Sequence, residues 1–262
     1  GNNFYDKLTG HSTAKNSFVV GSSNDALINS DGALTSATRS SFSNEGPTDD
    51  LRIKPDIMGN GGGVYSTFDS SSDAYNNLQG TSMAAPNVTG SLLLLQQYYN
   101  ELNGNFMRAA TLKGLALHTA DNMDVLGPDA NTGWGLMNTK VAAETITTNG
   151  FESWISEEVL KNGETYSITF KTDGLSPLLA SISWTDKPGI ANTGNVNDQT
   201  AVLVNDLDVK VTRENNEYKP WRLTWVDSNE QGDNLVDPYE RVDIINPTSG
   251  EYTITVTHKG TL

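Results

Sequence analysis

The chain has 262 residues, of which 32 are acidic and 17 basic, so its formal net charge at pH 7 is -15. This charge excludes nucleic acid and anionic membranes as expected partners because both would repel it, and the absence of cysteine excludes disulfides and thiolate sites. The hydrophobic content of 36% is typical of a folded protein, and the length fits one large or two medium domains. No apolar run is long enough to predict a membrane span.

Residues 1–148 combine short strands with helices. Apolar runs at residues 17–21 and 53–58, bounded by Gly, Asn and Pro, predict two buried strands. Apolar residues at intervals of three and four predict helices over residues 82–102, 107–118 and 138–146. We expect Pro86 in the first turn of the first helix, where its missing N–H costs little because that group has no intrahelical acceptor.

From residue 149 onward the pattern becomes almost purely strand-like. β-branched residues in rough alternation form five runs separated by turn clusters, at residues 165–170, 178–184, 201–211, 241–245 and 252–257. This pattern is typical of an antiparallel β-sandwich. We therefore predict two domains, residues 1–148 and 149–262. Truncation of the second domain at its C-terminus is left open, because the chain ends five residues after the last predicted strand.

A serine that opens a helix is the strongest candidate for chemistry. Ser82 lies in the string GTSMAAP, directly before the apolar part of the first predicted helix. A helix N-terminus offers free N–H groups and a partial positive charge, which favour negative charge developing beside Ser82. Gly80 permits a tight turn and close approach of a substrate. The alternative is that Ser82 is an ordinary helix N-cap, a role that serine often fills.

The surrounding residues decide between these alternatives. GTSMAAP followed by NVTG resembles the nucleophile motif of the subtilisin family almost residue for residue. Residues 13–23, 40–57 and 131–138 resemble further segments of the same catalytic domain in the same order, although GNGGG at residues 59–63 departs from the family's Ala-Pro-Gly. The resemblance implies part of an α/β subtilisin-like catalytic domain whose N-terminal portion is missing, followed by an all-β jelly-roll-like sandwich.

The same resemblance implies a serine endopeptidase that cuts proteins or peptides through an acyl-enzyme on Ser82, outside a bacterial cell or on its surface. Subtilisin-type triads run Asp, His, Ser along the chain, so both partners precede the nucleophile. His11 is the only histidine before Ser82, and neither His11 nor Asp31, which lies in a predicted turn, matches a family motif. We therefore expect the catalytic Asp and His in a missing N-terminal part of the same protein, and an inactive chain without it.

Asn2 occupies the place of the asparagine that, in this family, stabilises the tetrahedral oxyanion together with the serine's backbone N–H. Loss of this donor in a subtilisin costs about 10²- to 10³-fold in rate. The alternative is a terminal asparagine with no role in catalysis. Another class of function also stays open, in which the chain is a non-catalytic binding or structural protein that keeps the subtilisin fold.

Asp186, Asp206 and Asp208 are candidate ligands for structural calcium; no catalytic cofactor is expected. Residues 183–186 and 203–209 resemble the β-sandwich appended to some bacterial relatives of subtilisin, and such domains can bind calcium. Asp206 and Asp208 alternate along a predicted strand and therefore share a face, where Asp186 could join them. The alternative, of equal weight, is that these are solvated acids at strand ends.

Overall fold

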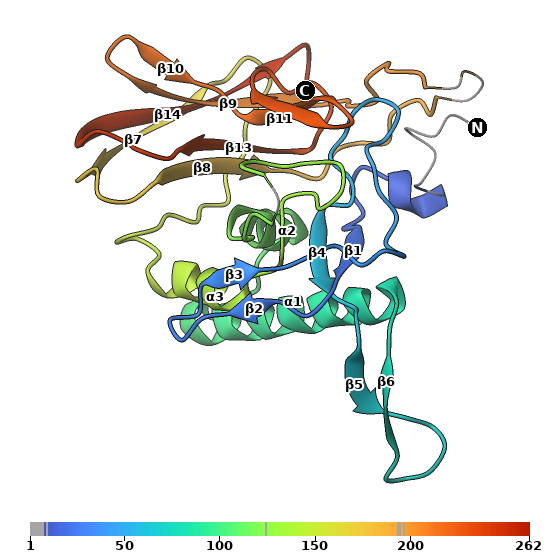
Figure 1. Ribbon diagram of the computed structural model, residues 1–262. Helices are drawn as coiled ribbons and strands as arrows, with labels where there is room; N and C mark the ends of the chain where they lie inside the picture. The colour runs from blue at the N-terminus through green and yellow to red at the C-terminus, as the bar shows by residue number, and fades with distance from the viewer. Residues whose placement is uncertain (1–7, 9, 124, 193–194, 196) are drawn as a thin grey trace.

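A two-stranded parallel sheet and a long helix stand at the centre of the N-terminal part of the chain (Figure 1). The computed structural model describes residues 8, 10–123, 125–192, 195 and 197–262. Strand β1 (Val20–Ser23) pairs with β4 (Ile57–Asn60) in parallel. Helix α1 (Thr81–Asn103) packs against both strands, and α2 (Ala109–His118) and α3 (Thr139–Thr147) lie beside it. The three predicted helices are confirmed.

Helix α1 is bounded by glycines that its ends require. Gly80 precedes it at φ 151°, and Gly104 follows it at φ 73° and donates its N–H to the carbonyl of Asn100. Pro86 is the sixth helical residue rather than part of the first turn, so its missing N–H leaves the carbonyl of Ser82 without its usual intrahelical donor. None of the helices in the described residues is long and apolar enough to cross a bilayer.

A short 3-10 helix and two small hairpins, none of them predicted from the sequence, surround this centre. A 3-10 turn, η1 (Gly10–Thr13), precedes β1, and β2 (Leu27–Ile28) pairs with β3 (Leu34–Ser36). Strands β5 (Val64–Thr67) and β6 (Tyr75–Leu78) form a hairpin that joins β4 to α1 and projects from the body in Figure 1. The sequence pattern predicts neither hairpin, because most of their residues are exposed and carry no alternation of buried and exposed positions.

The C-terminal part consists of antiparallel strands. In chain order they are β7 (Tyr166–Thr172), β8 (Leu178–Ser183), β9 (Asp206–Arg213), β10 (Asn216–Tyr218), β11 (Trp221–Trp225), β12 (Ser228–Gln231), β13 (Tyr239–Ile244) and β14 (Gly250–Lys259). The order β10-β9-β14-β7 forms a four-stranded sheet, while β13-β8 and β11-β12 form pairs. The β8–β13 pair faces the four-stranded sheet across a buried apolar cluster of Ala180, Val209, Val211, Val242, Ile244 and Tyr252.

These strands confirm most of the predicted pattern but not its assembly into a jelly-roll-like sandwich. Four of the five predicted runs form strands close to their expected bounds, and the fifth, at residues 201–211, begins only at Asp206. Its first part is held instead by Asp186, which accepts the N–H groups of Val204 and Asn205 at 2.8 Å each. The jelly-roll-like sandwich is not confirmed, because the sheets are small and open.

A buried apolar cluster joins the two parts of the chain. Trp134, from the N-terminal part, packs edge-on against Tyr239 of β13 with ring centroids 4.9 Å apart. The same cluster contains Ile53, Ile57, Val88, Ala116, Leu117, Ala130 and Leu223. The division into domains 1–148 and 149–262 stays a prediction, and the apolar core of the described residues crosses that boundary.

Candidate active site

Ser82 is the second residue of α1, and its side chain is exposed. The N-cap position belongs to Gly80, and no side chain caps the helix. The interpretation of Ser82 as an N-cap is therefore wrong. The carbonyl of Gly80 accepts the N–H groups of Met83 at 3.0 Å and Ala84 at 3.3 Å, which starts the helical hydrogen bonding one residue beyond Ser82.

The electrostatics at Ser82 follow from this position. Backbone N–H groups in the first turn of a helix have no intrahelical acceptor and carry the positive end of the helix dipole. The N–H of Ser82 lies in that turn. An oxyanion that forms next to the exposed hydroxyl is therefore stabilised by the backbone itself, which is the chemistry that nucleophilic attack on a carbonyl requires.

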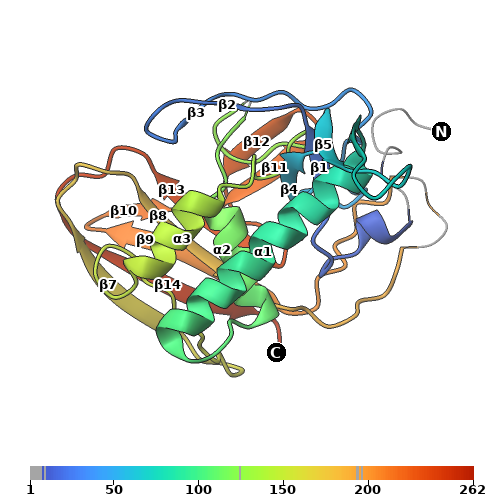
Figure 2. The same ribbon diagram turned by 90° about the horizontal axis from the view of Figure 1, so that it is seen from below.

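The glycines of GNGGG are explained by the packing of α1. A Cβ on Gly61 would lie 2.5 Å from the carbonyl oxygen of Gly80, and one on Gly59 would lie 2.7 Å from a methyl carbon of Val88. Only glycine lets the end of β4 approach the start of α1 this closely. Gly59 and Gly61 therefore let this segment pack closely against α1. Figure 2 shows this end of α1 beside β1 and β4.

The histidines lie elsewhere in the described residues. His118 ends α2, and its Nδ1 lies 2.9 Å from the hydroxyl of Ser181 in β8. Burial, and then the nearby Arg241, lower its pKa to about 4. The Nε2 of His258 accepts the N–H of Gly163 at 2.6 Å. Among the described residues, no hydrogen bond joins either histidine to Ser82.

His11 and Asp31 are both exposed, and Asp31 lies in a turn, as predicted. His11 is an exposed member of η1, and no hydrogen bond joins it to Ser82 in the part of the chain that the structure describes. Asp31 lies in a turn in which the side-chain oxygen of Asn29 accepts the N–H groups of Asp31 at 3.0 Å and Ala33 at 2.8 Å. Asn2, the predicted oxyanion donor, lies outside the described residues.

The calcium site predicted on Asp186, Asp206 and Asp208 stays a prediction, and Asp186 has close partners of its own. Its carboxylate is buried and is already occupied by Lys15, whose Nζ lies 2.5 Å from Oδ2, in addition to the two backbone N–H groups. No group of three or more acidic, His or Cys side chains is arranged to hold a metal ion in the described ranges. Calcium stays a prediction from the sequence without a site among these residues.

Asp206 and Asp208 do share a face, as their alternation predicts, and that face holds a lysine. The Nζ of Lys259 lies 3.5 Å from Asp206, 2.5 Å from Asp208 and 2.6 Å from Asp233. These carboxylates raise the pKa of Lys259. The pairing of Lys15 with Asp186 and of Lys259 with Asp208 could not be read from the sequence. The partners lie 171 and 51 positions apart in the chain.

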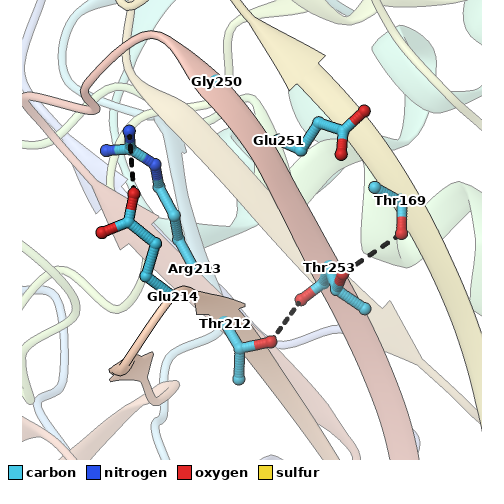
Figure 3. A pocket seen from close by; sticks show the side chains of 7 residues that line it. All are labelled: Thr169, Thr212, Arg213, Glu214, Gly250, Glu251 and Thr253. Atoms are coloured by element: carbon cyan, nitrogen blue, oxygen red, sulfur yellow. Dashed lines mark hydrogen bonds and ion pairs between the residues drawn. The ribbon is translucent and has the colours of Figure 1, made fainter.

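A polar hollow of about 600 Å³ lies over β7, β9 and β14. The side chains that line it are drawn in Figure 3. It is lined by Thr169, Thr212, Arg213, Glu214, Gly250, Glu251 and Thr253. Its one basic side chain is already engaged, because Arg213 pairs with Glu214, donates to the carbonyl of Ser249 at 3.1 Å and stacks 5.4 Å from the ring centre of Tyr252. This hollow therefore adds no chemistry to that of Ser82.

Comparisons with known proteins agree with this picture. A family model described as the subtilase family matches residues 1–135. The chain is 29% identical over 156 residues to the PII-type proteinase of Lactococcus lactis subsp. cremoris, covering 50% of this chain and 8% of that protein. It is 31% identical over 136 residues to subtilisin DY of Bacillus licheniformis, covering 52% of this chain and 44% of that protein.

Among solved structures, the chain is similar to fervidolysin from Fervidobacterium pennivorans, described as a keratinolytic enzyme related to subtilisin. The identity is 16% and the TM-score 0.41, over 91% of this chain and 28% of that one. The chain thus spans less than half the length of each of these relatives.

Proposed function

The chain belongs to the subtilase family, and from this premise we propose that it forms part of a serine endopeptidase that hydrolyses proteins or peptides through an acyl-enzyme on Ser82. The observation that supports this most directly is the exposed Ser82 at the N-terminus of α1, within the string GTSMAAP. A nucleophile at this place has the backbone N–H groups of the first turn beside it, where they favour the developing oxyanion.

The proposed reaction has two steps. The Ser82 Oγ attacks the peptide carbonyl, and the resulting oxyanion accepts hydrogen bonds from the Ser82 N–H and the Asn2 side chain. The amine leaves with the proton taken from Ser82, and water then hydrolyses the acyl-enzyme to regenerate the hydroxyl. The base that moves the proton is a histidine, and in this family it precedes the serine along the chain. We propose that it and its Asp partner lie upstream of residue 1.

The exposed face of α1 supports an upstream partner in the same protein. Leu93 and Leu94 are 67% and 63% exposed, and Ala85 and Pro86 are exposed between them and Ser82. An apolar helix face of this kind is normally covered in a folded protein. The proposed occupant is the part of the catalytic domain that carries the Asp and His, so the chain without it is expected to be inactive.

The C-terminal strands are proposed to stabilise the catalytic part. They contribute Tyr239 and Leu223 to the core shared with Trp134, and Asp186 pairs with Lys15 from the other part of the chain. A location outside the cell or on its surface is proposed as well, as the family resemblance implies.

Hydrolysis of an unstructured protein substrate tests the proposal. The complete protein is expected to cleave it, whereas a Ser82→Ala variant with the same melting temperature and the 262-residue chain alone are expected not to. Cleavage that survives Ser82→Ala would overturn the assignment of the nucleophile. No cleavage by the complete protein would favour the non-catalytic alternative.

A further inference from the structure

Strand β1 ends in two serines that are completely buried, although a buried hydroxyl must find a partner. Ser22 and Ser23 are both 0% exposed. The hydroxyl of Ser22 lies 3.0 Å from that of Ser40, and its N–H donates to the hydroxyl of Ser43 at 2.9 Å. The N–H and the hydroxyl of Ser22 are therefore both tied to the segment at residues 40–43.

Ser23 is tied instead to the end of β4. Its hydroxyl donates to the carbonyl of Gly59 at 3.2 Å, and its own carbonyl accepts the N–H groups of Gly61 at 3.0 Å and Gly62 at 3.1 Å. Ser23 thus binds three glycines of this segment, Gly59, Gly61 and Gly62, through its hydroxyl and its carbonyl. Gly61 has no side chain and no room for one, so its position depends on the hydrogen bonds that its backbone makes.

From Gly61 the connection continues to the nucleophile. The carbonyl of Gly61 accepts the N–H of Gly80 at 2.8 Å, and the carbonyl of Gly80 accepts the N–H groups of Met83 and Ala84. Ser82 lies between these residues. A path of hydrogen bonds therefore runs from the backbone carbonyl of Ser23 through Gly61 and Gly80 to the first turn of α1. The Ser23 hydroxyl holds the start of this path, because it binds the carbonyl of Gly59, two residues before Gly61.

We propose that Ser23 is a positioning residue for Ser82, acting through Gly61 and Gly80; this inference rests on the function proposed above. The orientation of a nucleophile governs the rate of attack more than the binding of substrate, since small displacements of reacting atoms raise the barrier steeply. Loss of the Ser23 hydroxyl removes its bond to Gly59 and loosens the strand end from which the backbone path starts. It is therefore expected to lower kcat and to leave KM nearly unchanged.

The test compares Ser23→Ala with Ser43→Ala in the complete protease. Both variants remove a buried hydroxyl from the same cluster, but Ser43 contacts Ser22 and not the path to Ser82. Ser23→Ala is expected to lower kcat about fivefold, the change expected for one neutral hydrogen bond, with KM within about twofold. Ser43→Ala is expected to lower the melting temperature to a similar extent while kcat, measured well below that temperature, stays within about twofold.

Hydrogen exchange at the Gly80 amide gives a readout that does not depend on activity. Ser23→Ala is expected to speed this exchange by the same factor of about five, and Ser43→Ala to leave it unchanged. Equal exchange rates in both variants, or equal values of kcat, would overturn the role of Ser23. A wild-type protease that cleaves nothing while Gly80 exchange still responds to Ser23→Ala would instead count against the proposed function alone.

Discussion

Replacing Arg241 by methionine is expected to lower the free energy of unfolding by about 3 to 5 kcal/mol, the range for removing one partner of a buried ion pair. Arg241 is 2% exposed, and its guanidinium donates to Asp243 from Nε at 2.7 Å and from Nη2 at 2.8 Å. Asp243 is also buried, so methionine would leave its carboxylate without a countercharge.

The same guanidinium reaches the N-terminal part of the chain. Nη1 donates to the carbonyl of Leu117 near the end of α2 at 3.1 Å, and the guanidinium carbon lies 4.8 Å from the ring centre of Trp134. Each of these contacts contributes about 1 kcal/mol, so the expected loss falls in the upper part of that range. The effect is large because Arg241 joins the two parts of the chain.

Urea unfolding followed by tryptophan fluorescence measures this loss. Lys140→Met is the matched control, because Lys140 and Glu144 form an exposed pair and its removal should cost less than about 0.5 kcal/mol. The double variant Arg241→Met/Asp243→Leu should recover much of the loss, since no buried charge remains unpaired. A loss for Arg241→Met no larger than that for Lys140→Met would refute the reasoning.

Two further changes test other parts of the account. Burial lowers the pKa of His118 from 6.5 to about 4. Between these two pH values the unfolded chain binds a proton at His118 and the folded chain does not, so up to about 3 kcal/mol of stability is lost as the pH drops from 6.5 to 4. His118→Gln should weaken the dependence of the melting temperature on pH over this range. An unchanged pH dependence would contradict the lowered pKa of His118. Lys15→Met should cost about 2 kcal/mol in urea unfolding, because Asp186 keeps only its two backbone donors. A loss near zero would show that the pair does not join the two parts.

The helices were predictable because their ends and their apolar faces are encoded locally. The predicted helix at residues 82–102 differs by one residue at each end from α1, since Gly80 and Gly104 stop it on both sides. The β5–β6 hairpin was not predictable, because all four residues of β6 are exposed and no pattern of burial marks them. The sheet arrangement was only partly predictable, since strand pairing depends on contacts between residues far apart in the chain.

The candidate site divides in the same way. The position of Ser82 follows from a local string, and so does the shared face of Asp206 and Asp208. The pairing of Asp186 with Lys15 could not be predicted, because the two residues lie 171 positions apart in the chain. The spacing of two aspartates along one strand predicts that they share a face, but not which lysine pairs with them.

Reaction of Ser82 with a fluorophosphonate probe tests the central claim most directly. In the complete protein, the probe is expected to form a covalent adduct that peptide mapping places on Ser82, because an activated serine next to an oxyanion site attacks phosphorus as it attacks a carbonyl. Ser82→Ala should abolish the adduct without changing the melting temperature. A complete, folded protein that leaves Ser82 unlabelled would contradict the account.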